Sequence, residues 1–254
     1  MKTTLKLILI YFAYQLLAGA AMTGISFVWP LGTTTQVGWS LLLSGAAMTA
    51  HLVGFGYVNL HRLLRPVGID VMLCSLVCMA GTALAGNALS VLIPLPNWLD
   101  SDFTALGHTA LGAFCIALLA PWVEELLFRG AILPRLHAYS GSRSRGIVLS
   151  ALFFGLIHIN PAQVPFAFLV GLAFGWVTVC TRSLLPALIG HALNNSLGVI
   201  EILVYGHSNA NTALHDESIG SLLIIVIAGA AVAIISGSKL THHILLEREE
   251  SRTK

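Results

Sequence analysis

Two adjacent glutamates and an arginine interrupt an otherwise apolar stretch, PWVEELLFRG, at residues 121–130. A carboxylate in hydrocarbon costs at least a few kcal/mol on insertion scales, so ionisable residues within spanning segments usually face a cavity, pair with one another or do chemistry. Glu125 and Arg129 are four residues apart, the helical spacing at which a glutamate pairs with a following arginine. Glu124 is turned about 100° away on a helix. We therefore expect Glu125 to be structural and Glu124 to be available for chemistry.

Two further polar pairs lie in later apolar segments, each with the same spacing of four. Phe154 precedes His158 by one helical turn, and His191 precedes Asn195 in the same way. On a helix each pair therefore shares a face. A lone histidine in a membrane helix is most often a hydrogen-bonded contact between helices, but four costly polar residues in neighbouring helices are hard to explain as unrelated contacts. The pattern predicts one site that gathers Glu124, Glu125, His158 and His191.

The composition identifies a membrane protein. Of the 254 residues, 56% are hydrophobic and 9% are charged, far below the roughly 25% charged residues of a soluble domain. The net charge of +2 and the absence of a basic cluster with interleaved aromatics exclude nucleic acid as a partner. We expect a multi-pass protein of the cell membrane, which is the cytoplasmic membrane in a prokaryote, with the lipid bilayer as its surroundings.

The apolar runs predict an all-α, polytopic fold with about eight transmembrane helices in a single membrane domain, residues 1–254. Three N-terminal helices are expected within residues 1–100, the polar motifs within residues 103–205, and a C-terminal helix at residues 219–240. The fifth span is short against the roughly 20 residues of a membrane helix, so we expect it to be tilted, re-entrant or partly buried. The expected spans are 5–29, 38–59, 71–95, 103–136, 146–159, 164–180, 184–205 and 219–240.

Positive residues support an even number of spans, because cytoplasmic loops collect Lys and Arg. With the N-terminus placed in the cytoplasm and the spans alternating, all 13 Lys and Arg residues fall on the cytoplasmic side. The opposite loops, including 96–102 and 206–218, hold none. We therefore expect both termini to be cytoplasmic.

The four cysteines do not suggest a disulfide framework or a zinc knuckle. They all lie inside apolar runs, and no CxxC or Cys/His cluster groups them. We interpret them as small apolar residues of the helices. They are Cys74, Cys78, Cys115 and Cys180.

Together the three motifs resemble those of a family of intramembrane proteases. The order EExxxR, FxxxH and HxxxN, on successive or nearly successive helices, is similar to the CAAX protease and bacteriocin-processing family, abbreviated CPBP or ABI, which includes the type 2 CAAX prenyl endopeptidase. The resemblance covers about residues 106–205 and matches every motif position. It implies an endopeptidase that hydrolyses peptide bonds of membrane-associated protein or peptide substrates.

The resemblance also implies roles for individual residues. Glu124 with His158 would activate a water, and His191 with Asn195 would form the oxyanion hole. Glu125, Arg129 and Phe154 would support the site. Peptide hydrolysis in a membrane needs these functions, namely an activated water, a proton donor and oxyanion stabilisation, shielded from lipid.

Two alternatives remain open from the sequence. Glu124, His158 and His191 are a plausible zinc set with an open position for water, which would make the protein an intramembrane metalloprotease. We favour the metal-free mechanism with no cofactor, because there is no HExxH motif and the three candidates come from separate helices. A proton-coupled transporter or an inactive membrane scaffold would also bury such residues, but no repeat or paired broken helices indicate transport.

Overall fold

The computed structural model describes residues 1–206, 214 and 217–253, and of residues 243 and 245–253 it describes the backbone only. Over these residues the chain is helical, without strands. Part of the expected outer loop at 206–218, including His207 and His215, lies outside the described residues. The longest helices are α1 (Lys2–Val28), α2 (Thr33–Gly54), α4 (Ile69–Leu92), α10 (Gln163–Thr181), α11 (Leu185–Tyr205) and α12 (Ile219–Thr253).

A continuous helical run from Ala110 to Ser140 carries the EExxxR motif. It consists of α6 (Ala110–Phe114), the π-helix η1 (Cys115–Leu119), α7 (Ala120–Glu125), the π-helix η2 (Leu126–Ile132) and α8 (Leu133–Ser140). Three shorter helices complete the described chain, namely α3 (Leu60–Leu63), α5 (Asp100–Gly107) and α9 (Arg143–Leu156).

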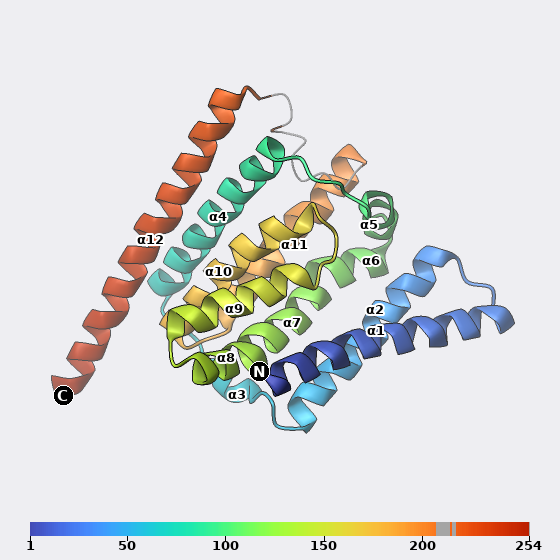
Figure 1. Ribbon diagram of the computed structural model, residues 1–254, viewed down its shortest axis with the longest axis horizontal. Helices are drawn as coiled ribbons and strands as arrows, with labels where there is room; N and C mark the ends of the chain where they lie inside the picture. Colours follow the sequence, from blue (N-terminus) through green and yellow to red (C-terminus); the bar gives the residue numbers. More distant parts are fainter. Residues whose placement is uncertain (207–213, 215–216, 254) are drawn as a thin grey trace.

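Seven helices in the described part of the chain are long and apolar enough to cross a membrane, counting the run 110–140 as one. The predicted all-α polytopic fold is therefore confirmed. The expected fifth span is α9, which has only 14 residues and falls short of the length of a spanning helix. It packs against α8 and α10 (Figure 1), and it contributes a buried face.

Two of the boundaries that differ from the expected spans are set by a capping residue. The fourth span does not begin at Phe103, because α5 ends at Gly107 and Thr109 starts a new helix by accepting a hydrogen bond from Gly112 N at 3.0 Å. The second span ends at Gly54, and Asn59 instead caps α3 through Arg62 N at 3.1 Å. The C-terminal helix continues beyond residue 240 to Thr253.

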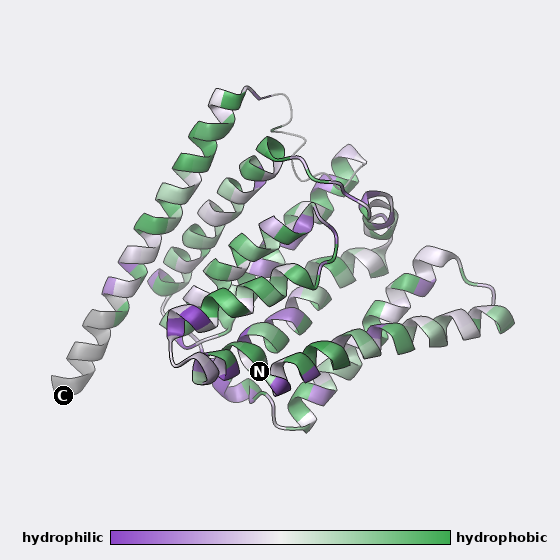
Figure 2. Ribbon diagram, viewed as in Figure 1, coloured by the Kyte–Doolittle hydropathy of each residue, from purple (hydrophilic) through white to green (hydrophobic). Residues whose placement is uncertain are grey.

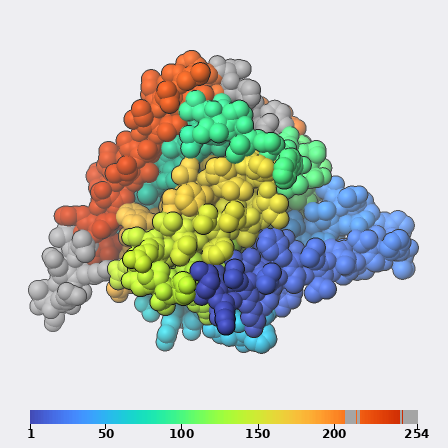
Figure 3. All heavy atoms as spheres, in the orientation of Figure 1, coloured from blue at the N-terminus to red at the C-terminus, as the bar shows by residue number. Residues whose placement is uncertain are grey.

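The helices form two peripheral pairs around a central group. α12 lies along α4 at one edge of the molecule, and the α1–α2 hairpin projects at the other, with α7 to α11 between them (Figures 1 and 3). The start of α1 and the end of α12 lie at the same end of the molecule as α3 and α8 (Figure 1). Hydrophilic residues gather at that end around α3, α8 and the start of α9 (Figure 2). The cytoplasmic assignment of this end remains a prediction.

The π-helix η1 sits where Pro121 disturbs the motif helix. A proline within a helix lacks the N–H that would complete the backbone ladder and crowds the preceding turn. In η1 the Ala120 N–H donates to Cys115 O, five residues back. The carbonyl of Ile116 is consequently left without a helical donor, because the residue five positions ahead of it is Pro121. A carbonyl freed in this way is available to another helix.

Candidate active site

One cavity of about 1270 Å³ lies between the central helices and is bordered by the motif residues. Its lining is mainly apolar and comes largely from α2, α4, α10 and α11, with polar side chains among the apolar ones. Four of those polar groups come from three different parts of the chain that the sequence predicted to meet. They are Glu124, His158, His191 and Asn195.

The predicted pair of Glu125 and Arg129 is present and completely buried. Arg129 Nη1 donates to Glu125 Oε1 at 2.9 Å, and Nη2 donates to Gly171 O at 3.0 Å on α10. The guanidinium also lies over the rings of Phe154, 4.3 Å from the centroid, and Phe174, at 5.2 Å. A charge pair taken out of water needs such additional contacts to compensate for its desolvation. Arg129 therefore joins the motif helix to α9 and α10.

His191 is held by the same carboxylate. Its Nδ1 lies 2.9 Å from Glu125 Oε1, and because an ionised carboxylate only accepts, the ring donates Nδ1–H. Phe174 stacks on the imidazole at 4.9 Å between ring centroids, and Phe154 meets it edge-on at 5.8 Å. Glu125 thus accepts from two helices at once, which is more than the structural pairing that its spacing predicted.

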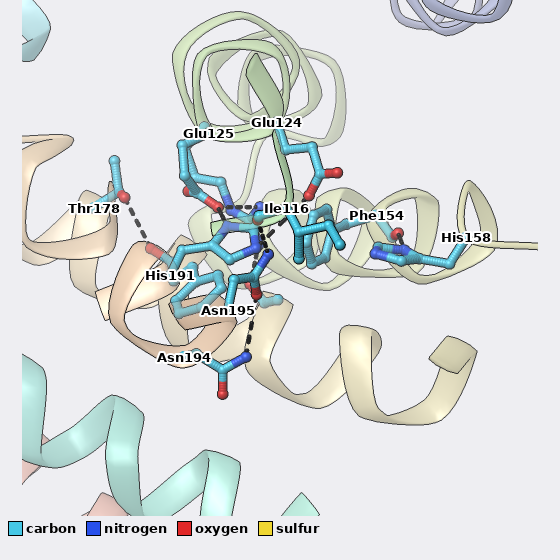
Figure 4. A network of polar contacts seen from close by, with 12 residues as sticks. Ile116, Glu124, Glu125, Phe154, His158, Thr178, His191, Asn194 and Asn195 are labelled. Atoms are coloured by element: carbon cyan, nitrogen blue, oxygen red, sulfur yellow. Dashed lines mark hydrogen bonds and ion pairs between the residues drawn. The ribbon is translucent and has the colours of Figure 1, made fainter. Parts of the chain in front are cut away.

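Glu124 faces the other nitrogen of His191. Its Oε2 lies 3.7 Å from His191 Nε2, and 9% of the residue is exposed. In Figure 4 the imidazole lies with one edge toward Glu125 and the other toward Glu124. The two adjacent glutamates therefore contact opposite nitrogens of one ring, with Glu125 buried behind the site and Glu124 bordering the cavity.

Asn195 lies one turn after His191 and is oriented by two contacts. Its Nδ2 donates to Ile116 O at 3.0 Å, the carbonyl that Pro121 frees, and its Oδ1 accepts from Asn194 Nδ2 at 3.3 Å. The amide NH₂ group has two hydrogens, of which Ile116 takes one. The other is available at the cavity that Asn195 lines.

His158 lies beyond the regular end of α9, on the far side of Phe154 from His191 (Figure 4). Its Nδ1 lies 2.8 Å from Phe154 O, so the ring donates Nδ1–H to that carbonyl and Nε2 is free to accept. The Phe154 ring meets the imidazole edge-on at 5.1 Å between centroids. The predicted proximity of Phe154 and His158 is therefore present, although His158 follows the helix rather than lying within it.

The alternative zinc set does not form a ligand cluster. Among the residues that the structure describes, no three His, Cys, Asp or Glu side chains are grouped so that they could hold a metal ion. The lack of a cofactor remains a prediction.

Several residues at the cavity were not predicted from the sequence. Tyr11 and Gln15 on α1 line it, four residues apart in the first apolar span, a polar pair that could have been noticed. The Ile116 carbonyl had a weaker signal, a proline five positions later. Asn97 also lines the cavity, from the loop between α4 and α5, and nothing in its neighbourhood in the sequence indicated this.

Part of the chain is similar to known proteins. Residues 106–197 match the family described as type II CAAX prenyl endopeptidase Rce1-like. A protein of Schizosaccharomyces pombe named probable CAAX prenyl protease 2 is 31% identical over 102 residues, which cover 32% of this chain and 38% of that protein. This chain thus aligns with well under two thirds of that relative's length. No solved structure matches the chain. The matched segment contains all three motifs, and over residues 106–197 the chain is similar to the Rce1-like family.

Proposed function

We propose that this protein is an intramembrane endopeptidase that hydrolyses peptide bonds in membrane-associated protein or peptide substrates. The observation that carries the proposal is the meeting of Glu124 and His191, 3.7 Å apart, at a cavity that His158 and Asn195 also line. A carboxylate, two imidazoles and an amide can supply the base, the proton donor and the oxyanion donors that hydrolysis of an amide needs. The match to the Rce1-like family supports the same reaction class.

In the proposed mechanism, Glu124 is the general base and later the general acid. His158 orients the water, because its free Nε2 accepts a hydrogen bond from one O–H of that water. Glu124 removes the proton of the other O–H. The water oxygen then forms a bond to the carbonyl carbon of the substrate. When the tetrahedral intermediate collapses, the C–N bond breaks and Glu124 returns its proton to the leaving nitrogen.

His191 and Asn195 stabilise the negative oxygen that forms during this attack. Glu125 fixes His191 by accepting Nδ1–H, so Nε2 carries the second proton when the ring is charged and donates it as a hydrogen bond. Asn195 offers the NH that Ile116 does not use. Donors held in place before the reaction need little reorganisation, which is why they lower the barrier in a site with little water.

The cavity volume and its apolar lining fit a substrate that arrives through the bilayer. A space of about 1270 Å³ is larger than the 300–1,000 Å³ of typical small-molecule pockets. The Schizosaccharomyces pombe relative is named a CAAX prenyl protease, and this supports a substrate with a membrane-attached end. The donor groups act on the peptide bond that is cleaved and not on the lipid.

The decisive experiment compares protein termini in membranes containing wild type, Glu124→Gln or Glu217→Gln. Glutamine keeps the shape of Glu124 and removes the base, so cleavage should fall to background while the folded protein stays abundant. Glu217 is exposed and does not line the cavity, so its variant serves as the matched control. New termini that appear equally with wild type and with Glu124→Gln would contradict the proposal.

A further inference from the structure

His158 is carried by a tight turn rather than by a regular helix. α9 ends at Leu156, and α10 begins only at Gln163. Between them His158 N donates to Gly155 O at 3.2 Å, and Asn160 N donates back to His158 O at 2.6 Å. The position of the imidazole in the cavity therefore depends on the conformation of this turn.

The turn holds Ile159 in a conformation that its side chain disfavours. Ile159 has φ +60°, in the left-handed region that β-branched residues almost never adopt. Its side chain is 65% exposed, so packing around it does not compensate for the strain. The surrounding structure must therefore impose this conformation.

Asn160 supplies that constraint from inside the protein. The residue is 1% exposed, its Oδ1 accepts from Trp98 N at 3.1 Å, and its Nδ2 donates to Asn97 Oδ1 at 2.7 Å. A third bond, from Ala162 N to Pro96 O at 3.2 Å, joins the same two segments. These bonds tie the turn to the loop at 93–99 between α4 and α5, which precedes the segment 106–197 that matches the family.

We propose that Asn160 and Asn97 form a latch that positions His158. With the latch closed, Asn160 keeps the residue before it at positive φ, and His158 keeps its Nδ1–H on Phe154 O with Nε2 directed to the cavity. With the latch open, Ile159 relaxes to negative φ, and the backbone that carries His158 moves. The consequence for turnover rests on the proposed function, but the consequence for the position of His158 does not.

The test measures His158 directly and turnover separately, on the full chain in lipid nanodiscs. The NMR signal of the ¹³C-labelled His158 ring is assigned by its loss in His158→Gln, and kcat and KM are measured with a substrate identified by terminus mapping. In Asn160→Ala the signal should shift or broaden, and kcat should fall about 10²-fold, as expected for a displaced reacting group, with KM little changed. Asn97→Ala, which leaves the Trp98 bond in place, should show the same changes to a smaller degree.

Relief of the strain should restore the site, and this separates positioning from loss of fold. Glycine adopts positive φ without steric cost, so Ile159→Gly added to Asn160→Ala should return the His158 signal and recover kcat about fivefold or more. Asn59→Ala removes an amide that caps α3 away from the cavity, and should leave signal and kcat unchanged.

The possible outcomes separate the latch from the proposed function. An unchanged His158 signal in Asn160→Ala, or a displaced signal that Ile159→Gly does not restore, overturns the latch whatever the activity. A displaced signal with full kcat overturns the positioning role. If wild type cleaves nothing while the signal responds as expected, the proposed function fails and the latch stands.

Discussion

The motif run at 110–140 and the C-terminal helix α12 are both apolar enough to span a bilayer, yet they relate to the rest of the protein in opposite ways. Half of the most apolar window of the motif run is buried in protein, against 17% for α12. Lipid solvates leucine and isoleucine as well as a protein interior does, so hydrophobicity alone does not dock a membrane helix. What holds the motif run is its polar groups, and what holds α12 is close backbone contact.

The polar network of the motif run couples four helical segments through one carboxylate. Glu125 accepts from Arg129 on its own helix and from His191 on α11, and Arg129 continues to Gly171 on α10 and to the Phe154 ring on α9. A change at Glu125 should therefore be felt by the fold and by the site together. The side chains of α12 that the structure describes form no comparable network, and its outward residues, such as Ile224 and Ile227, are about two-thirds exposed.

Glu125→Gln should have the largest combined effect. It removes the charge that compensates Arg129 and fixes His191, and breaking one side of a buried pair typically costs about 3 to 5 kcal/mol. We expect a lower melting temperature and protein yield together with lost turnover, measured by thermal unfolding in detergent and by substrate cleavage. Glu124→Gln is the matched control, the same substitution one residue away, and should lose turnover with a melting temperature close to wild type. Equal stability of the two variants would contradict the division of roles between the glutamates.

The oxyanion donors should come next in size. Asn195→Ala removes one donor and should lower kcat by about 10² to 10³ with KM little changed, because such a donor acts mainly in the transition state. His191→Ala should lose at least as much, and it also frees Glu125. Asn194→Ala, which removes only the contact to Asn195 Oδ1, should have a smaller effect.

Elemental analysis of the same proteins tests the metal-free mechanism. Zinc that is stoichiometric in wild type and absent in His191→Ala, together with activity that chelation removes and added zinc restores, would show that His191 is a metal ligand. An amide is a poor zinc ligand. Severely reduced turnover in Asn195→Ala with the metal content of wild type would therefore support the role of Asn195 as a hydrogen-bond donor.

The sequence predicted which residues gather at the site and the ion pair within one helix, but not the hydrogen bonds that join separate segments. The spacing of Glu125 and Arg129 is a local rule of helix geometry, and their ion pair is present. The hydrogen bond from His191 to Glu125 joins residues 66 positions apart. It depends on how α11 is rotated against α7, and the periodicity of the sequence does not predict that rotation. The same holds for Asn160 and Asn97, because a turn residue at positive φ gives no signal when it is an isoleucine.

Two helix boundaries were missed because the expected spans were based on apolar run length and not on capping residues. Thr109 and Asn59 are both side chains that favour the first position before a helix, and each marks a boundary that apolar run length alone overlooked. The length of an apolar run indicates which residues can lie in a bilayer, whereas a capping residue indicates where a helix begins. The motif region needed both, because α5 and the run 110–140 are apolar on either side of the break.

The smallest of these effects should come from the contact between α4 and α12. A Cβ placed on Gly81 would lie 2.7 Å from Gly229 O and 2.8 Å from Ala233 N, so neither helix can yield without moving its backbone. Gly81→Leu should therefore separate α12 from α4 and lower stability by about 1 to 3 kcal/mol, the usual cost of overpacking. Gly24→Leu on α1, where a Cβ would meet nothing within 4 Å, is the matched control and should unfold like wild type. Because Gly81 does not line the cavity, kcat of the folded fraction should fall by less than about tenfold, well below the loss from removing an oxyanion donor. A loss of turnover in Gly81→Leu as complete as in Glu124→Gln would mean that α12 does more than cover α4, and that the contrast between the two helices does not extend to function.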